Sequence, residues 1–313
     1  MGESEQRQTR HKRKRKLRVG RVVSFILLLL LLVGGVYTVI QYMNGYNSAK
    51  GEIVPSSEFT GDTLTDGDRE NILVLGIDSR GEEQSRTDTM MLVSWNKENN
   101  DVKVISFMRD IYADIPGYQS YKLNTAYYLD GVQLVKDTIS SMFDVPIHHY
   151  ALIDFNSFET LVDIVAPNGV PINVEKDMSE KIGVTLTKGQ QNLTGKELLG
   201  YARFRSDEEG DFGRVNRQQI VMEALQDEIL SIGNLANIPE FIGATEGYIE
   251  TDLTKKDKID RVIDAVTSGK LSMDKLTVPT EGTYYYNNYS HAGSVIEINS
   301  EENRAAIQEF LGK

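Results

Sequence analysis

The pattern of apolar and polar positions from residue 71 onward predicts interleaved strands and helices. Short apolar or alternating runs between polar turns are typical of buried strands, and apolar residues spaced three and four apart are typical of helices. The expected strands are 71–78, 89–95, 102–108, 150–153, 169–174, 275–279 and 294–298. The expected helices are 123–143, with a possible break at Gly131, 157–165, 193–202, 213–232, 238–248, 255–268 and 300–311. This order predicts an α/β domain in which helices cover a mixed central sheet.

A different pattern precedes this domain. Residues 22–40 are uncharged and almost wholly apolar, and about 20 such residues cross a bilayer as a helix. We therefore expect a transmembrane signal anchor at 22–43, a polar extracellular stalk at 44–69 and the domain at 70–313. A cleaved signal peptide is the alternative, but its apolar core is usually about 7–15 residues long and ends at a small-residue site. The run here is longer, and 47–49 is a poor site.

Charge along the chain indicates its orientation in the membrane. Residues 1–21 hold nine Lys and Arg against two Glu, although the whole chain has a net charge of −12. By the positive-inside rule this basic tail is cytoplasmic, and the domain lies outside the cell membrane on a single-pass anchor. The acidic domain does not favour nucleic acid as a partner, so we interpret the tyrosines at 284–286 as packing or surface aromatics. The chain has no cysteine, which excludes disulfides and thiolate metal sites.

Arginines gather in the segment YARFRSDEEGDFGRVNRQQ, residues 201–219. Arg214, Arg217 and Gln218 share one helix face with Val221, so they continue a stripe that points toward the core. A charge near a core needs a partner. The acidic residues at 207–211 would supply it in a structural network, or the arginines would bind a multiply charged anion.

Arginine suits an anion site better than lysine does, because its planar fork binds phosphate or carboxylate oxygens bidentately. Arg203 and Arg205 are two residues apart and project the same way from an extended segment. Together with Arg214 and Arg217 they would surround a diphosphate. A helix N-terminus near Gly213 would add backbone donors.

Two aspartates flank the loop between the first two strands. Asp78 closes the first strand and Asp88 opens the second, so both lie at one sheet edge if the strands are neighbours. Two carboxylates completed by phosphates and water suit Mg²⁺, although turn-forming aspartates are common. Arg80 and Arg86 in the loop are possible partners for either carboxylate.

A third charged position follows the third strand. Arg109 comes directly after it and either marks a site or pairs with Asp110. The chain lacks the phosphate-binding loop, dinucleotide fingerprint, nucleophile elbow and zinc-protease motifs. His148 and His149 are adjacent and would face opposite sides of a strand, which disfavours a shared metal.

Taken together, these segments resemble the LytR-CpsA-Psr family over about residues 71–232. The resemblance rests on several long motifs in order: NILVLGIDSR, SRTDTMML, ISFMRDIYADIPGY, KLNTAYYLDG, KELLGYARFR and GDFGRVNRQQ. A basic tail followed by one membrane helix is also the layout of the family.

The resemblance implies a phosphotransferase that uses Mg²⁺ or Mn²⁺ and moves a glycopolymer, such as wall teichoic acid, from a polyprenyl-diphosphate lipid to peptidoglycan. It implies Asp78 and Asp88 as metal ligands, and Asp88, Arg109, Arg203 and Arg205 as catalytic residues. The diphosphate-binding positions that it implies are Arg86, Arg109, Arg203, Arg205, Arg214 and Gln218. Arg80 lies in a loop whose length varies within the family, and Asp211 and Arg217 lie beside the pattern, so the resemblance assigns these three no role. Asp88 or a nearby carboxylate would accept the proton of the acceptor hydroxyl.

Two other functions are compatible with the same residues. A diphosphate hydrolase would use water as the acceptor, and a cell-envelope regulatory or binding protein would not catalyse transfer at all. Teichoic acid, capsule and secondary wall glycan are each compatible as the polymer. The sequence also does not separate the apolar residues of a lipid groove from those of the core.

Overall fold

The computed structural model of the protein describes residues 19–49, 58–65, 69–78, 86–99, 101–231, 233–269 and 272–312. The chain divides into a unit of residues 1–40 and a unit of residues 41–313. Most of the predicted basic tail, part of the predicted stalk and the position of Arg80 lie outside the described residues.

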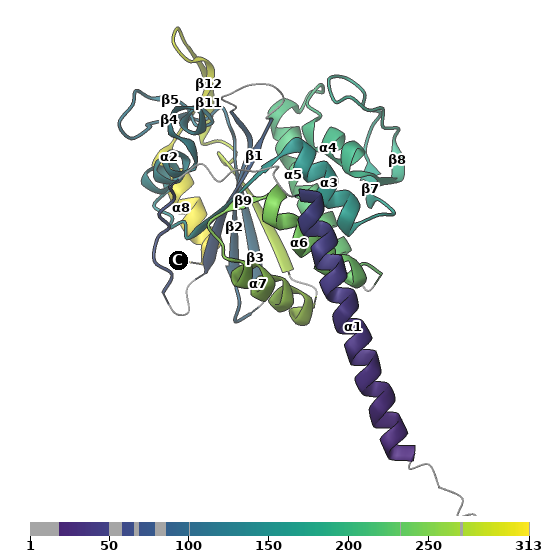
Figure 1. Ribbon diagram of the computed structural model, residues 1–313. Coiled ribbons are helices and arrows are strands. Elements are labelled where there is room, and N and C mark those ends of the chain that lie inside the picture. The colour runs from purple at the N-terminus through teal and green to yellow at the C-terminus, as the bar shows by residue number, and fades with distance from the viewer. Residues whose placement is uncertain are drawn as a thin grey trace, which may run out of the picture. The chain divides into compact units, whose positions relative to one another are not determined.

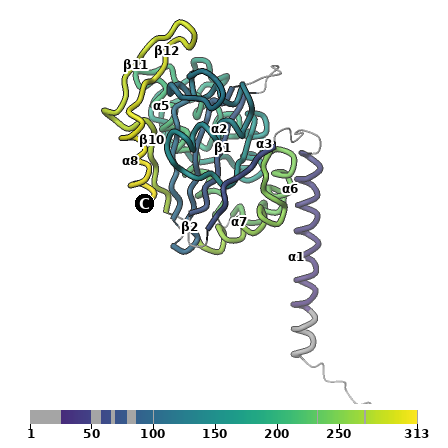
Figure 2. The backbone as a smooth tube through the Cα atoms, turned by 90° about the vertical axis from the view of Figure 1, so that its left-hand side faces the viewer, coloured from purple at the N-terminus to yellow at the C-terminus, as the bar shows by residue number. Residues whose placement is uncertain are grey.

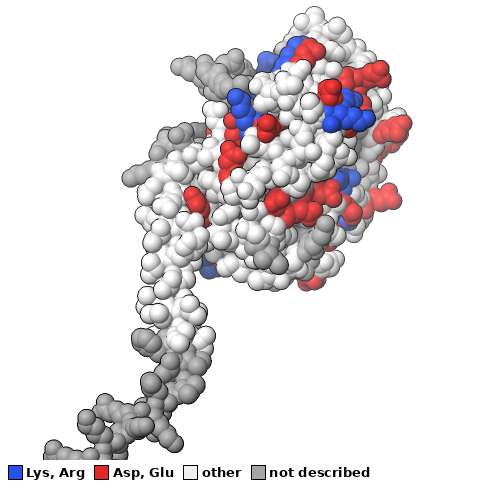
Figure 3. Space-filling model, turned by 90° about the vertical axis from the view of Figure 1, so that its right-hand side faces the viewer, with Lys and Arg blue, Asp and Glu red and all other residues white. Residues whose placement is uncertain are grey.

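The first unit contains most of the helix α1, Val19–Ala49. The most apolar 18-residue stretch within residues 26–49 of this helix has a mean hydropathy of 2.2, and none of that stretch is buried. Figure 3 shows that the described surface of α1 carries no Lys, Arg, Asp or Glu. By length and composition, α1 is a candidate to cross a membrane. It continues past the predicted end at residue 43, so the first residues of the expected stalk are helical.

The last turns of α1 belong to the second unit, where they pack against α6, Ile238–Tyr248 (Figure 2). The two backbones approach closely through glycines. A Cβ atom at Gly45 would lie 1.9 Å from the carbonyl oxygen of Glu240, and one at Gly243 would lie 2.1 Å from that of Tyr42. Any larger residue at either glycine would therefore push the helices apart.

A mixed six-stranded sheet forms the centre of the second unit, in the order β10-β3-β2-β1-β6-β9. Its strands are β1 Glu70–Ile77, β2 Thr87–Asn96, β3 Asp101–Phe107, β6 His149–Asp154, β9 Glu250–Thr251 and β10 Ser272–Val278. β1 runs antiparallel to β2 and parallel to β6, and β10 runs parallel to β3. The predicted mixed sheet is confirmed.

Helices cover both faces of this sheet, as Figure 1 shows. Leu73 and Leu75 point to the face that α2, Thr125–Phe143, and α8, Ser300–Leu311, cover. Val74, one residue out of phase, points to the other face, where α5 and α7 contribute Met222 and Ala265. The helices on that side are α3 Phe155–Val165, α4 Gly195–Arg203, α5 Gly210–Ile229 and α7 Lys255–Ser268, with the short turn η1 Leu235–Asn237.

Three two-stranded ribbons complete the described fold. They pair β4 Tyr112–Ala113 with β5 Tyr121–Lys122, β7 Val170–Val174 with β8 Gly189–Leu193, and β11 Tyr284–Tyr289 with β12 Gly293–Ile298. The β7–β8 ribbon packs with α3 and α4 in a second apolar core.

Most predicted elements occur within a few residues of their expected bounds. The break expected in the helix 123–143 is present, because Gly131 has φ 65° and Asp130 is also non-helical. The strands β8 and β11 were not predicted. β8 has the sequence GQQNL and β11 has YYYNNY, and neither alternates between apolar and polar residues. Only pairing with β7 and β12 makes them strands.

Candidate functional site

A cationic cavity of about 270 Å³ lies where β1 ends and β2 begins. The antiparallel pairing of β1 with β2 brings these ends together, with a bulge between Gly76 and Ile77. Five of its lining residues are basic and two are acidic. The charged residues of its lining are Asp88, Arg109, Glu180, Lys181, Arg203, Arg205 and Arg214.

Arg109 is held at this cavity by three carboxylates. One of its terminal nitrogens donates to Asp88 Oδ1, Nε lies 3.6 Å from Asp110 Oδ2, and Nη2 lies 3.7 Å from Asp211 Oδ2. Burial disfavours the charged form of Arg109, but Asp88, Asp211 and Asp110 outweigh it and raise the pKa of the guanidinium. Arg109 is thus held in place as a cation. One interpretation of the sequence was a simple ion pair with Asp110, but Arg109 also pairs with Asp88 and Asp211.

Arg214 is a buried cation with too little negative charge around it. It is only 4% exposed. The one ion pair that it makes among the described residues is with Asp211, at 3.4 Å, and its Nε has no hydrogen-bond partner there. Burial and the positive charge of Arg109 lower the pKa of the Arg214 guanidinium, and Asp211 and Asp88 offset this only in part. A buried guanidinium in such surroundings indicates a place for an anion.

Arg203 and Arg205 reach the same cavity from the end of α4. The Arg203 guanidinium lies 4.5 Å from the centre of the Phe155 ring, and its Nη2 lies 3.5 Å from Asp78 Oδ2. Arg205 is exposed. Both arginines line the cavity, and Phe204 between them in the chain is buried.

Arg217 is directed elsewhere, although the sequence placed it on the same helix face as Arg214. It is 1% exposed and donates from Nε to Glu175 Oε1 at 2.7 Å. It also donates to the carbonyl oxygen of Phe204 at 3.2 Å and to Asp207. Arg217 lines neither described cavity and takes part in a structural network instead.

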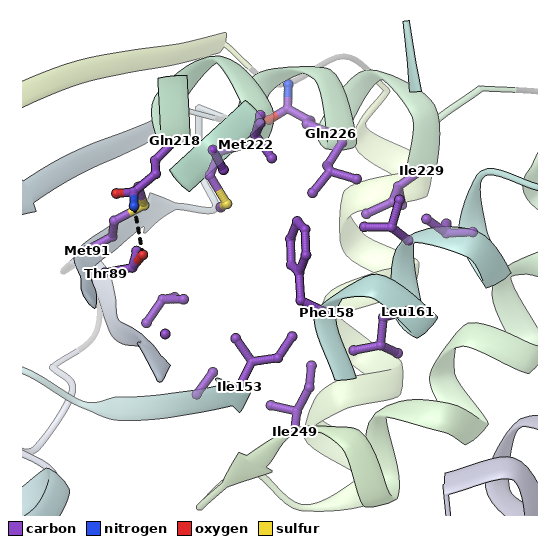
Figure 4. A pocket seen from close by; sticks show the side chains of 18 of the residues that line it. Thr89, Met91, Ile153, Phe158, Leu161, Gln218, Met222, Gln226, Ile229 and Ile249 are labelled. Carbon is purple, nitrogen blue, oxygen red and sulfur yellow. Dashed lines mark hydrogen bonds between the residues drawn. The ribbon is translucent and has the colours of Figure 1, made fainter. Parts of the chain in front are cut away.

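Gln218 lies between this cavity and a second one. Its Nε2 donates to Thr89 Oγ1 at 2.9 Å (Figure 4). Both residues line both cavities, as do Phe155, Leu199 and Ala202. The two cavities are therefore contiguous at Gln218.

The second cavity is larger, about 450 Å³, and almost entirely apolar. Figure 4 shows side chains of α3 and α5, including Phe158 and Ile229, pointing into it. Phe241 of α6 and Ile249 close it on another side. We call it the apolar cavity. An apolar space that opens onto a cationic one suits a ligand with a hydrocarbon chain and a charged head group.

Asp78 and Asp88 lie on adjacent strand ends beside the cationic cavity. Their side chains are 28% and 30% exposed and are paired with Arg203 and Arg109. The described residues contain no cluster of three or more His, Cys, Asp or Glu that could hold a metal ion. This donor set does not form a cage, but it suits Mg²⁺, which commonly takes one or two carboxylates and completes its shell with phosphates and water.

Arg86 is exposed and lies outside both cavities. Its guanidinium lies 5.8 Å from the centre of the Tyr128 ring on α2. The diphosphate contact that the resemblance implies for Arg86 stays a prediction.

Residues 36–307 match the model of the LytR_cpsA_psr family, and the chain belongs to this family. It is 43% identical over 278 residues to the regulatory protein MsrR of Staphylococcus aureus (strain COL), with 88% of this chain and 85% of that protein covered. It is 31% identical over 242 residues to the polyisoprenyl-teichoic acid–peptidoglycan teichoic acid transferase TagU of Bacillus cereus (strain AH820), covering 75% of this chain and 79% of that protein. Among solved structures, it is similar to the family protein YwtF (TagT) with bound octaprenyl pyrophosphate lipid. The TM-score is 0.60 at 27% identity, with 80% and 94% covered.

Proposed function

We propose that this protein is a phosphotransferase that moves a glycopolymer from a polyprenyl-diphosphate carrier to peptidoglycan at the cell membrane. The observation that carries the proposal is that two cavities adjoin at Gln218, one cationic with the under-neutralised Arg214 and the other apolar. The names of TagU as a teichoic acid transferase and of TagT with a bound prenyl pyrophosphate support the same class of substrate.

In this proposal the diphosphate occupies the cationic cavity. Arg203, Arg205 and Arg214 bind its oxygens with Arg109, and their forks suit bidentate contacts. The hydrocarbon chain lies in the apolar cavity, and Gln218 contacts the phosphate at the junction. Asp78 and Asp88 would hold Mg²⁺ or Mn²⁺, and such an ion supplies charge neutralisation to the diphosphate when bound.

Transfer requires little covalent chemistry from the protein, because positioning and charge stabilisation dominate phosphoryl transfer. The acceptor hydroxyl oxygen forms a bond to the phosphorus that carries the glycan, and the bond from that phosphorus to the bridging oxygen breaks. Polyprenyl phosphate leaves with the negative charge, which the arginines stabilise. Asp88 accepts the hydroxyl proton in this scheme.

The test uses the full-length chain in detergent with a lipid-linked glycopolymer and isolated peptidoglycan. We expect the polymer to appear on peptidoglycan and polyprenyl phosphate to be released in equal amount. Release of polyprenyl phosphate together with free phosphorylated glycopolymer in the absence of peptidoglycan would instead identify a hydrolase, with water as the acceptor. An Asp88→Asn variant with full transfer would exclude Asp88 as the proton acceptor, and no transfer by the unaltered protein would favour a binding or regulatory role.

α1 would hold the enzyme at the membrane as a single-pass anchor with its domain outside the cell. Its apolar surface supports membrane insertion, and the basic residues before it support a cytoplasmic N-terminus. Protease treatment of intact spheroplasts should remove the domain and leave an N-terminal epitope tag protected. Loss of the tag with the domain protected would instead indicate the reverse orientation.

A further inference from the structure

The hairpin β11–β12 exposes tyrosines on both of its faces. Side chains alternate along a strand, so Tyr284 and Tyr286 share one face and Tyr285 points to the other. Tyr285 and Tyr286 are 62% and 65% exposed. The packing of Tyr284 and Tyr286, with ring centres 6.0 Å apart at 90°, makes that face a continuous aromatic surface.

The backbone fixes this surface next to the cationic cavity. The N–H of Ile296 in β12 donates to the carbonyl oxygen of Asp110 at 2.8 Å. Tyr286 is the partner of Ile296 in the ladder, and Asp110 directly follows Arg109. Figure 1 shows the hairpin above the same end of the sheet at which β1 ends.

Side-chain contacts also link the tyrosines of the hairpin to the ion pairs of the cationic cavity. The Tyr284 ring packs on Phe212 of α5 with centres 5.2 Å apart. Phe212 directly follows Asp211, which pairs with both Arg109 and Arg214. Partial desolvation raises the pKa of Tyr286, and Tyr284, Asp211 and Asp110 add to the effect, so these two carboxylates lie within electrostatic range of the exposed ring.

The direction of a bound substrate follows from which residues the cavities share. Gln218 lines both cavities, whereas Arg109 lines only the cationic one. A diphosphate whose lipid lies in the apolar cavity would therefore extend from Gln218 into the part of the cationic cavity that Arg109 and the other unshared residues line. On the Arg109 side of the cavity, the next residue in the chain is Asp110, whose carbonyl oxygen accepts from Ile296 of the hairpin.

We propose that Tyr284 and Tyr286, with Asp211 at their edge, form a subsite for the first sugars of the donor glycopolymer. This inference rests on the proposed function. A pyranose ring has an apolar face that packs on an aromatic ring and hydroxyls that donate to carboxylates. The exposed ring of Tyr286 beside an acidic group supplies both kinds of contact.

The experiment compares Tyr286→Ala with Tyr285→Ala in the full-length protein, since the two residues are neighbours, equally exposed and on opposite faces. KM for a lipid-linked glycan donor should rise about three- to tenfold in Tyr286→Ala, which is the loss expected for one aromatic contact. KM for the same donor should stay unchanged in Tyr285→Ala, and in Tyr286→Phe it should equal the value of the unaltered protein. Affinity for polyprenyl diphosphate without sugar should be the same in all variants.

Several results would overturn the subsite. Equal KM values for the glycan donor in Tyr286→Ala and Tyr285→Ala would do so. An increase in KM for peptidoglycan alone would also do so, and it would assign the surface to the acceptor. A weaker affinity of Tyr286→Ala for bare polyprenyl diphosphate would place the ring at the diphosphate instead. Failure of the unaltered protein to bind bare polyprenyl diphosphate would contradict the proposed function and is a separate outcome.

Discussion

Two arginines on one helix, three residues apart, have opposite electrostatic surroundings. Arg217 donates to Glu175, Asp207 and a backbone carbonyl. Arg214 has one carboxylate at 3.4 Å and an unsatisfied Nε among the described residues. Since an unpaired buried charge is destabilising, we interpret Arg217 as a structural residue and Arg214 as a binding residue.

The first prediction concerns Arg214→Met, which keeps an unbranched side chain and removes the charge. Transfer activity should fall about 10²–10³-fold, by analogy with other charge-stabilising donors. The temperature of unfolding should stay the same or rise, because an uncompensated charge leaves the interior. Calorimetry and a transfer assay on the same preparation check both. A large drop in unfolding temperature would show that Arg214 is structural.

Arg217→Met on the same helix should behave in the reverse way. Asp207 would lose a buried partner, and breaking such a pair lowers the free energy of unfolding by about 3–5 kcal/mol. Chemical denaturation measures this loss. Activity per folded molecule should change far less than in Arg214→Met. A stable but inactive Arg217→Met variant would show that Arg217 contacts substrate.

The third prediction concerns pH and His149, at the opposite end of β1 from the cationic cavity. Asp252 and Glu70 raise the pKa of His149 to about 9 from an ordinary value of 6.5. The folded protein binds the proton of His149 more tightly than the unfolded chain does, so protonated His149 stabilises the fold. This contribution is fully present below about pH 6.5 and is lost as the pH rises through about 9. The free energy of unfolding should fall by about 1–3 kcal/mol over that range.

His149→Asn is the matched variant for this measurement. It should be less stable than the unaltered protein at pH 6 and should show a flatter dependence between pH 6.5 and 9. The lowered pKa of Glu70, about 2, reflects the same hydrogen bond and an ion pair with Arg261, so it is not counted again. Parallel stability curves for the two proteins would contradict the prediction.

At the scale of elements, the site depends on three junctions. The pairing of β1 with β2 places Asp78 near Asp88. The end of α4 and the start of α5 bring Arg203 and Arg214 to one cavity. α3, α5 and α6 together enclose the apolar cavity. The fold therefore joins a charged and an apolar space at the end of one sheet.

The packing of the end of α1 on α6 leads to a fourth prediction. Gly243→Ala would place a Cβ 2.1 Å from the backbone oxygen of Tyr42, so the helices must separate. We expect the unfolding free energy of the full-length protein to fall by about 1–3 kcal/mol. Gly233→Ala is the control, because nothing lies within 4 Å of its added Cβ. Equal effects of the two substitutions would show that the close approach does not matter.

At the scale of the whole molecule, the chain combines a membrane-compatible helix with a domain that has its own core. A chain that begins at Gln41 keeps the complete second unit. We expect it to fold without a membrane and to bind inorganic diphosphate. Isothermal titration at low salt should detect this binding, and Arg214→Met should weaken it. An unfolded product would show that residues 1–40 are required for folding.

Much of this architecture could be predicted from local pattern. The period of apolar residues located β1, β2, β3 and most helices, because each must bury one face. The motif order indicated the family, and the family match confirmed it. Arg203, Arg205, Arg214 and Gln218 were singled out as candidates, and the structure brings them to one cavity. Their roles in binding stay predictions.

Other features depended on contacts between segments distant in sequence. Arg214 and Arg217 have the same residue type and almost the same helical phase, so only the positions of Glu175, Asp207 and Asp211 separate a structural charge from an available one. β11 became a strand only by pairing with β12, and this pairing placed Tyr286 opposite Ile296, whose N–H donates to the carbonyl oxygen of Asp110.

The sequence by itself determined the α/β order of elements, the apolar N-terminal helix and the motifs of the family, because hydrophobic period and residue type are local properties. Only the tertiary structure decided which arginines lie at the cavity and which apolar residues enclose empty space. Burial, ion pairing and enclosure depend on what the rest of the chain places around a side chain, and local pattern does not contain that information.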